Sequence, residues 1–291
     1  MKLWTAFGAG LALAVSTPAQ ATSDKTACAP YESFGSGPDL ILTPGLGSAP
    51  EVWADLSNQL SEDYTVHLVH IAGFAGRAPN GDPETVIDRA AQEIVDYLDC
   101  QNIESALYAG HSLGGFLGLK LATEHPDLIK RLVVVDSLPF MPLIFSPQAT
   151  AEGVAPRAEA LRAQIVGQSD EQFAQFQRGG VRSLVNNSDH HETVVDWTLN
   201  SDRATFAAAM HALMTTDLRP ELSKATTPVT VIAASNAFAP RDRIEATYSA
   251  AYANLPAMEL RIVEDSFHFI MLDQPAAFEA ELRRALSNEN P

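Results

Sequence analysis

The segment Gly-His-Ser-Leu-Gly at residues 110–114 places a serine between two glycines, in the pattern G-x-S-x-G. An apolar run, 105–109, precedes the segment, and a helix-compatible run, 116–124, follows it. This order of strand, tight turn and helix is the context in which such a serine stands exposed on a strained corner. The glycines leave room for backbone on both sides of the corner. The pattern therefore predicts a nucleophilic Ser112, and a turn that only reverses the chain is the alternative.

A serine hydroxyl is a weak nucleophile near neutral pH, so it needs a base within hydrogen-bond reach. His268 is the best candidate, because it follows the last expected strand, 258–263, and parallel strands end at the same edge of a sheet. His111 adjoins the serine and could line the site without taking the proton. His190 and His191 are adjacent, but no third ligand at metal spacing is visible, so we expect neither a metal nor a cofactor.

Two backbone N–H groups could hold the negative charge that develops on a carbonyl oxygen under attack. Leu113 opens the helix after the serine, and the first N–H groups of a helix have no partners within it. Leu46 is expected to supply the second group, because it lies in a glycine-containing loop, 43–48, after an apolar run. The alternative for this loop is a plain strand-to-helix turn.

The surrounding elements must bring the serine and the histidine to one edge. Short apolar runs alternate with stretches of helical periodicity, which predicts a mostly parallel sheet with helices on both faces. We therefore expect an α/β fold with a doubly wound sheet. The predicted strands are 31–34, 39–42, 64–71, 105–109, 131–135, 230–234 and 258–263, and the predicted helices outside the central part are 53–60, 83–100, 116–124, 241–254 and 275–287.

Residues 138–223 contain no run of the core-strand type and read instead as a helical cap, inserted after the sixth strand. The predicted helices within it include 158–166, 170–177 and 199–214, and the glycine pair 179–180 indicates a hinge or turn. We expect Phe140, Met141 and Phe145 to line an apolar substrate pocket. The alternative is that these side chains form a small core of the cap itself.

Four segments carry a family resemblance: Leu-Thr-Pro-Gly-Leu-Gly at 42–47, Ala-Gly-Phe at 72–74, Gly-His-Ser-Leu-Gly-Gly at 110–115, and the Phe-His-Phe…Gln-Pro tail at 267–275. Together with the order of serine, cap and histidine, they resemble the α/β-hydrolase superfamily over about residues 31–286. The resemblance implies serine-dependent hydrolysis, as in esterases and lipases, and does not identify the substrate.

The resemblance also implies an acid that orients the histidine, and here the sequence departs from the usual pattern. The acid commonly follows the strand 230–234, where this chain has no carboxylate and Asn236 is nearest. A minority of relatives carry the acid after the preceding strand, where this chain has Asp136. We predict Asp136 as the orienting acid, with Asn236 as a neutral alternative. Asp242, Asp265 or no acid at all stay open, and Asp136 could be only a cap-hinge residue.

Composition limits the class of protein. The 291 residues are 46% hydrophobic, which suits one domain, 22–291, with an insertion. The formal net charge of −17 disfavours binding to nucleic acid and to anionic membrane surfaces. We expect a small-molecule substrate as the partner, and the oligomeric state stays open.

The first residues have the pattern of a signal peptide. Lys2 precedes an apolar run, 3–15, and Ala-Gln-Ala at 19–21 matches a cleavage site. We therefore predict a signal peptide over 1–21, cleavage after Ala21, and a periplasmic or secreted protein with no membrane span. Export would permit a disulfide between Cys28 and Cys100, the two cysteines, and two unpaired thiols are the alternative.

These features together predict a carboxylesterase that acts on small to medium apolar esters through an acyl-enzyme on Ser112. The same groups could instead cleave a lactone, a thioester, a peptide or a carbon–carbon bond. A catalytically silent homologue that only binds a ligand is the alternative from another class.

Overall fold

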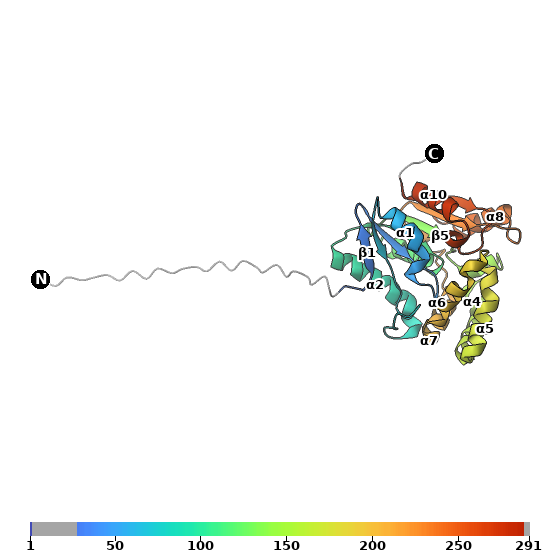
Figure 1. Cartoon of the computed structure of the whole chain (residues 1–291). Helices are drawn as coiled ribbons and strands as arrows, with labels where there is room; N and C mark the ends of the chain where they lie inside the picture. Colours follow the sequence, from blue (N-terminus) through green and yellow to red (C-terminus); the bar gives the residue numbers. More distant parts are fainter. Residues whose placement is uncertain (2–27, 288–291) are drawn as a thin grey trace.

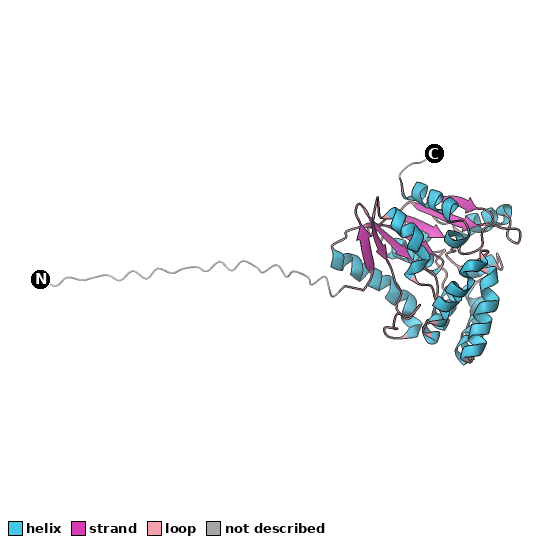
Figure 2. Cartoon of the chain, viewed as in Figure 1, coloured by secondary structure: helices cyan, strands magenta, loops and turns pink. Residues whose placement is uncertain are grey.

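A single seven-stranded sheet forms the centre of the protein, in a computed structural model that describes residues 1 and 28–287 (Figures 1 and 2). The strand order is β1-β3-β2-β4-β5-β6-β7, and every neighbouring pair is parallel except β1 and β3. The predicted signal peptide lies outside the described residues, apart from Met1. The strands are β1 Glu32–Gly35, β2 Asp39–Thr43, β3 Thr65–Leu68, β4 Ala106–His111, β5 Ile129–Val135, β6 Val229–Ala234 and β7 Met258–Val263.

Helices cover both faces of the sheet, which confirms the predicted doubly wound α/β fold. Alternate side chains of a strand point to opposite faces, so Val134 joins the core under α2, α3 and α8, whereas Val133 and Val135 join the core under α1 and α10. The α-helices outside the cap are α1 Ala54–Leu60, α2 Val86–Gln101, α3 Leu113–Glu124, α8 Arg241–Ala251, α9 Ile270–Asp273 and α10 Pro275–Leu286.

The cap segment, 138–223, follows β5 and precedes β6, so it follows the fifth strand and not the sixth as predicted. The five strands expected before residue 138 all form, and the described chain has no sixth strand ahead of the cap. Figure 1 shows the cap helices in yellow and gold beside the sheet, where α4 packs on α7 and α5 on α6. These helices are α4 Ala151–Gly167, α5 Asp170–Gly180, α6 His191–Leu199 and α7 Arg203–Thr215. The 3₁₀ turns are η2 Pro50–Trp53, η3 Pro83–Thr85, η4 Met141–Ile144, η5 Val181–Ser183, η6 Ser188–His190 and η7 Leu222–Lys224.

Three features of the cap differ from the prediction. The helix predicted over 158–166 begins earlier, at Ala151, because the Thr150 side chain accepts a hydrogen bond from the backbone N–H of Gly153 and caps it. The helix predicted over 199–214 begins at Arg203, because the side chain of Asp202 accepts a hydrogen bond from the backbone N–H of Thr205 and caps a new helix. The glycine pair 179–180 forms the last turn of α5 and is not a hinge, since Gly180 has helical dihedral angles.

A disulfide joins Cys28 to Cys100, with the two Cα atoms 5.9 Å apart. The bond links the segment before β1 to the last turn of α2, across a sequence separation of 72 residues. It therefore ties the N-terminal end of the described chain to the body of the domain. No helix in the described part of the chain is long and apolar enough to cross a membrane.

Candidate active site

Ser112 lies at the corner between β4 and α3, with φ 53° and ψ −115°. L-residues rarely adopt a positive φ, and such strain costs about 1–3 kcal/mol where the surrounding structure imposes it. Two backbone hydrogen bonds impose it here: Ser112 N–H donates to the carbonyl of Val135 at 2.9 Å, and Phe116 N–H donates to the carbonyl of Ser112 at 3.0 Å. The corner is thus held between the sheet and the first turn of the helix.

The glycines of the corner are required by close backbone contacts. A Cβ on Gly110 would lie 2.2 Å from the carbonyl oxygen of Gly114, and a Cβ on Gly114 would lie 2.3 Å from that of Thr43. Neither neighbour is a flexible side chain that could move aside. The expectation that both flanking positions must lack a Cβ is therefore confirmed.

Asp136 lies next to Ser112 at the carboxyl edge of the sheet. His111 and Val135 are paired across β4 and β5, and Ser112 and Asp136 are the residues that follow them. Neighbouring strands are about 4.8 Å apart, so the two residues lie side by side. Asp136 also has a positive φ, 43°, and its N–H donates to the carbonyl of Ile232 in β6. The carboxylate is thereby placed between the ends of β4 and β6.

Three donors bind the carboxylate of Asp136. His268 Nδ1 donates to Oδ2 at 2.7 Å, while Ala234 N–H and Tyr248 OH each donate to Oδ1 at 3.0 Å. The Asp136 side chain is only 11% exposed, so its contact with His268 is largely shielded from water. Since Nδ1 is engaged, the imidazole keeps Nε2 for a proton from another group.

His111 connects the serine corner to the loop that carries His268. Its Nε2–H donates to the carbonyl oxygen of His268 at 3.0 Å, and the centroids of the two imidazole rings are 4.5 Å apart. Complete burial, and then the neighbouring ring of His268, hold the pKa of His111 well below its usual value. His111 is therefore a neutral residue that holds the loop, whereas the His268 side chain is 26% exposed.

Asn236, the alternative to Asp136 as the residue that orients His268, forms its hydrogen bonds with other groups. Its amide nitrogen donates to the carbonyl of Ser266 at 3.0 Å, and its amide oxygen accepts from the N–H groups of Phe238 and Ala239. These bonds close the turn after β6. Of Asp136 and Asn236, the structure brings only Asp136 into hydrogen-bond contact with His268.

The two expected oxyanion donors flank the serine. Leu113 is the first residue of α3, and within residues 28–287 no backbone acceptor is found for its N–H or for that of Leu46. The loop that carries Leu46 runs directly against the corner, because a Cβ on Gly45 would lie 3.2 Å from Ser112 Cβ. Both N–H groups are thus available near the serine hydroxyl.

The three predicted pocket residues do not line one pocket. Phe140 has no exposed surface, because it belongs to the core and lies under the Arg219 guanidinium, 5.1 Å from the ring centroid. Phe145 is 79% exposed and faces solvent, and Met141 is half-buried. An apolar side chain at the start of the cap can serve either the core or the surface, and the sequence carries no signal that separates the two.

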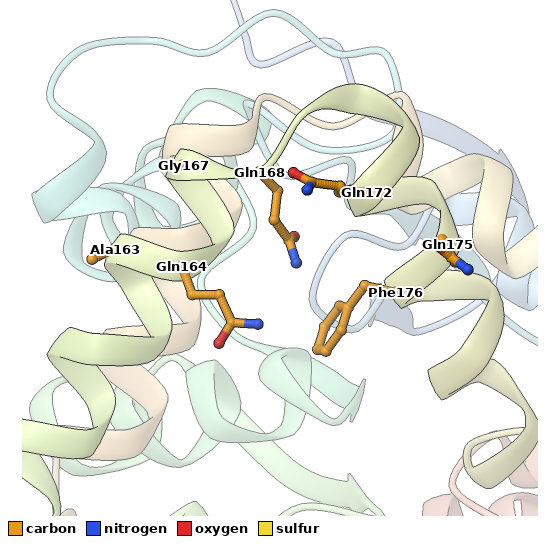
Figure 3. A pocket seen from close by; sticks show the side chains of 7 residues that line it. All are labelled: Ala163, Gln164, Gly167, Gln168, Gln172, Gln175 and Phe176. Carbon is orange, nitrogen blue, oxygen red and sulfur yellow. The ribbon is translucent and has the colours of Figure 1, made fainter.

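A hollow of about 640 Å³ lies within the cap between α4 and α5. Figure 3 shows three side chains turned towards it: Gln164 from α4, Gln168 from the turn after α4, and Phe176 from α5. Its lining is neutral and rich in amides, and it contains none of the predicted site residues.

Tyr248 is a site residue that sequence reasoning missed. It lies in α8 and is buried, and burial together with the nearby charge of Asp136 raises the pKa of its hydroxyl well above the usual value. The hydroxyl is therefore a permanent donor to Asp136. The sequence held no signal for this role, because the two residues are 112 positions apart.

The described residues include no cluster of side chains suited to bind a metal ion. Over residues 28–287, no group of three or more histidine, cysteine, aspartate or glutamate side chains is arranged to hold an ion.

Comparisons with known proteins agree with this geometry. Residues 40–281 match the Alpha/beta hydrolase family. A putative carbamate hydrolase RutD of Serratia proteamaculans is 29% identical over 77% of this chain and 81% of its own length, and a pimeloyl-(acyl-carrier protein) methyl ester esterase of Aeromonas hydrophila is 30% identical over 68% and 76%. The enol-lactonase structure from Burkholderia xenovorans LB400 superposes with a TM-score of 0.72, at 20% identity over 88% and 95% of the two chains. The chain therefore belongs to the alpha/beta hydrolase family and is a serine-dependent hydrolase of the esterase type.

Proposed function

We propose that the protein is a carboxylesterase in which Ser112 is the nucleophile, His268 the general base and Asp136 the orienting acid. The observation that carries the proposal is the 2.7 Å hydrogen bond between His268 Nδ1 and Asp136 Oδ2, at the strand end beside the strained serine. An aspartate in this position selects the tautomer with a free Nε2 and stabilises the imidazolium.

Acylation follows from these positions. His268 Nε2 takes the proton of the Ser112 hydroxyl while the oxygen attacks the ester carbonyl, and this Oγ–Nε2 hydrogen bond closes when substrate binds. The N–H groups of Leu113 and Leu46 donate to the resulting oxyanion. His268 then gives its proton to the departing alcohol oxygen, which leaves an acyl group on Ser112.

Deacylation uses the same groups in reverse. A water molecule enters, His268 accepts its proton, and the hydroxide attacks the acyl carbonyl. The tetrahedral intermediate collapses, Ser112 recovers its proton, and the acid is released. No cofactor takes part in this scheme.

The relatives support a carbonyl substrate. Among the similar proteins are a methyl ester esterase, a putative carbamate hydrolase and an enol-lactonase. Each name denotes attack on a carbonyl next to an oxygen or nitrogen. We propose an uncharged ester of small to medium size, since a net charge of −17 disfavours strongly anionic substrates.

The Ser112→Ala variant tests the function. We expect p-nitrophenyl ester hydrolysis to fall by about a thousand-fold or more and fluorophosphonate labelling to disappear. Ser61→Ala, at the C-terminal end of α1, is the matched control and should react as the wild type does. Retained labelling in Ser112→Ala, or an unlabelled wild type, would overturn the proposal. Measuring kcat/KM for a panel of lactones, thioesters, peptides and substrates with a cleavable carbon–carbon bond shows which of these other bonds the enzyme can also cleave.

We also propose that the enzyme works outside the cytoplasm, after cleavage behind Ala21. The supporting features are the signal-like pattern of residues 1–21 and the disulfide, which persists in oxidising compartments. The intact mass of the exported protein reports its first residue, which should be Thr22. A mass that includes residues 1–21 would contradict this.

A further inference from the structure

Asp273, at the end of α9, joins two parts of the chain that are distant in sequence. Its Oδ2 accepts a hydrogen bond from the N–H of Phe267 at 2.8 Å, the residue directly before His268. Its Oδ1 accepts from the N–H groups of Asn186 and Asn187, at 2.9 and 3.0 Å, in the cap between η5 and η6. One carboxylate thus joins the loop that carries His268, residues 264–269, to residues 186–187 of the cap. We call 264–269 the histidine loop.

A second bond ties the loop to the cap on the other side of His268. The N–H of Phe269 donates to the carbonyl of Leu184 at 3.0 Å. Both neighbours of His268 are therefore attached to the same stretch, 184–187. The carbonyl oxygen of His268 itself accepts the hydrogen bond from His111 Nε2.

We propose that Asp273 is a positioning residue for His268, through which seating of the cap aligns the base. This inference rests on the proposed role of His268. Asp273 contacts neither the imidazole nor the serine. It acts by holding Phe267, and hence the direction from which the imidazole reaches Asp136 and Ser112.

The alignment depends on cap residues 186–187, because their N–H groups donate two of the three hydrogen bonds that the Asp273 carboxylate accepts. Charge-assisted hydrogen bonds to backbone N–H groups are short and directional, so three of them leave the Asp273 side chain little freedom. If the segment 186–187 departs, Oδ1 loses both donors and the carboxylate can turn away from Phe267. The base is then aligned only when the cap is in place.

Asp273→Asn tests the proposal with almost no change of shape. An amide can accept from the cap with its oxygen, but its NH₂ group then faces the N–H of Phe267, and two donors cannot bond. A misplacement of about 1 Å costs on the order of 100-fold in rate. We expect kcat, and the rate of fluorophosphonate labelling, to fall about 10- to 100-fold with KM nearly unchanged.

Asp202→Asn is the matched control. Asp202 is a cap carboxylate that also accepts a backbone N–H, from Thr205, but it does not touch the histidine loop. Asparagine is an equally good helix N-cap, so kcat should change by less than about two-fold. The downfield proton resonance of the His268–Asp136 hydrogen bond reports alignment directly. It should shift or broaden in Asp273→Asn and stay in place in Asp202→Asn.

Two substitutions of Asn187, on the cap side, can be compared to isolate the loss of its backbone N–H donor. Asn187 has φ −75°, which a proline ring tolerates, so Asn187→Pro deletes the N–H that bonds Asp273. Asn187→Ala loses the same side chain but keeps that N–H. We expect kcat to be several-fold lower in the proline variant than in the alanine variant.

The outcomes separate this inference from the proposed function. If Asp273→Asn labels and turns over at the wild-type rate, or if only KM rises, the positioning role is wrong while the serine mechanism stands. If Ser112→Ala still labels, the proposed function itself fails. A fall in kcat with the unchanged proton resonance would likewise contradict the positioning role.

Discussion

The carboxylate of Asp136 shows how one side chain can define the chemistry of its neighbours. Three donors from three elements converge on it: the end of β6, helix α8 and the histidine loop. Two of these donors, Ala234 N–H and Tyr248 OH, hold the carboxylate in one orientation. Because the geometry of Asp136 is determined independently of His268, it can in turn determine the tautomer of the imidazole.

Replacing Asp136 by asparagine tests this at the scale of the residue. Asparagine keeps the shape but loses the charge, and the imidazole is no longer held in the productive tautomer. The equivalent change in a serine protease lowers kcat about ten-thousand-fold, and we expect a loss of a thousand-fold or more here, measured as kcat for a p-nitrophenyl ester.

Asn236→Ser is the comparison for that experiment. Asn236 bonds the turn after β6 and the carbonyl of Ser266, not His268, so its loss should lower kcat by less than about ten-fold. If Asn236→Ser proved as damaging as Asp136→Asn, the assignment of the orienting acid would be reversed.

At the scale of elements, the loops that contain Gly47 and Gly73 pack against the cap. A Cβ on Gly47 would lie 2.9 Å from the ring of Phe206 in α7, and a Cβ on Gly73 would lie 2.6 Å from Thr205. Asp202 N–H also donates to the carbonyl of Gly73 at 2.7 Å. Helix α7 is therefore packed directly on the loops beside the site, whereas the hollow is lined by residues of α4, α5 and the turn between them.

A pair of glycine-to-alanine changes tests the packing of elements. Gly110→Ala forces a Cβ to 2.2 Å from a backbone oxygen, so the β4–α3 corner must shift. We expect a loss of about 3 kcal/mol or more in the free energy of unfolding, together with a loss of esterase activity.

Gly179→Ala is the matched change in an open position. A Cβ there meets no atom within 4 Å, and the residue lies inside α5. Alanine should raise the free energy of unfolding by about 0.5–1 kcal/mol, measured by urea denaturation, with activity unchanged. Equal effects of the two changes would show that the corner tolerates a side chain.

At the scale of the whole molecule, the disulfide closes a large loop of the chain. The segment that begins at Cys28 leads into β1, the antiparallel strand at the edge of the sheet, and Cys100 lies in the last turn of α2. The loop between them contains β1, β2 and β3. A cross-link over such a length lowers the entropy of the unfolded chain more than it changes the native state.

We therefore expect the Cys28→Ser and Cys100→Ser double variant to lose about 2–4 kcal/mol in the free energy of unfolding. Its kcat should equal that of the wild type, because the bond is remote from Ser112. Denaturation with and without a reductant measures the effect. A reductant should destabilise the wild type and leave the double variant unchanged, and a wild type insensitive to reductant would contradict the pairing.

The sequence by itself determined the features that depend on near neighbours along the chain. The alternation of apolar runs and helical periodicity predicted the doubly wound sheet, because each element buries a face that its own residues define. The two glycines around Ser112 predicted the corner, since the contact between Gly110 and Gly114 is local. The prediction that His268 lies at the same edge of the sheet as Ser112 followed from its place after the last strand, since parallel strands end at one edge.

Only the tertiary structure decided which groups meet across that edge. Asp136 and Asn236 follow adjacent strands, so the sequence left both as partners of His268, and the turn that binds Asn236 decided between them. The burial of Phe140 and the exposure of Phe145 were likewise decided by packing. The physical reason is that a side chain has the same local signal whether it faces a core, a cleft or water, and only contacts between distant segments tell these apart.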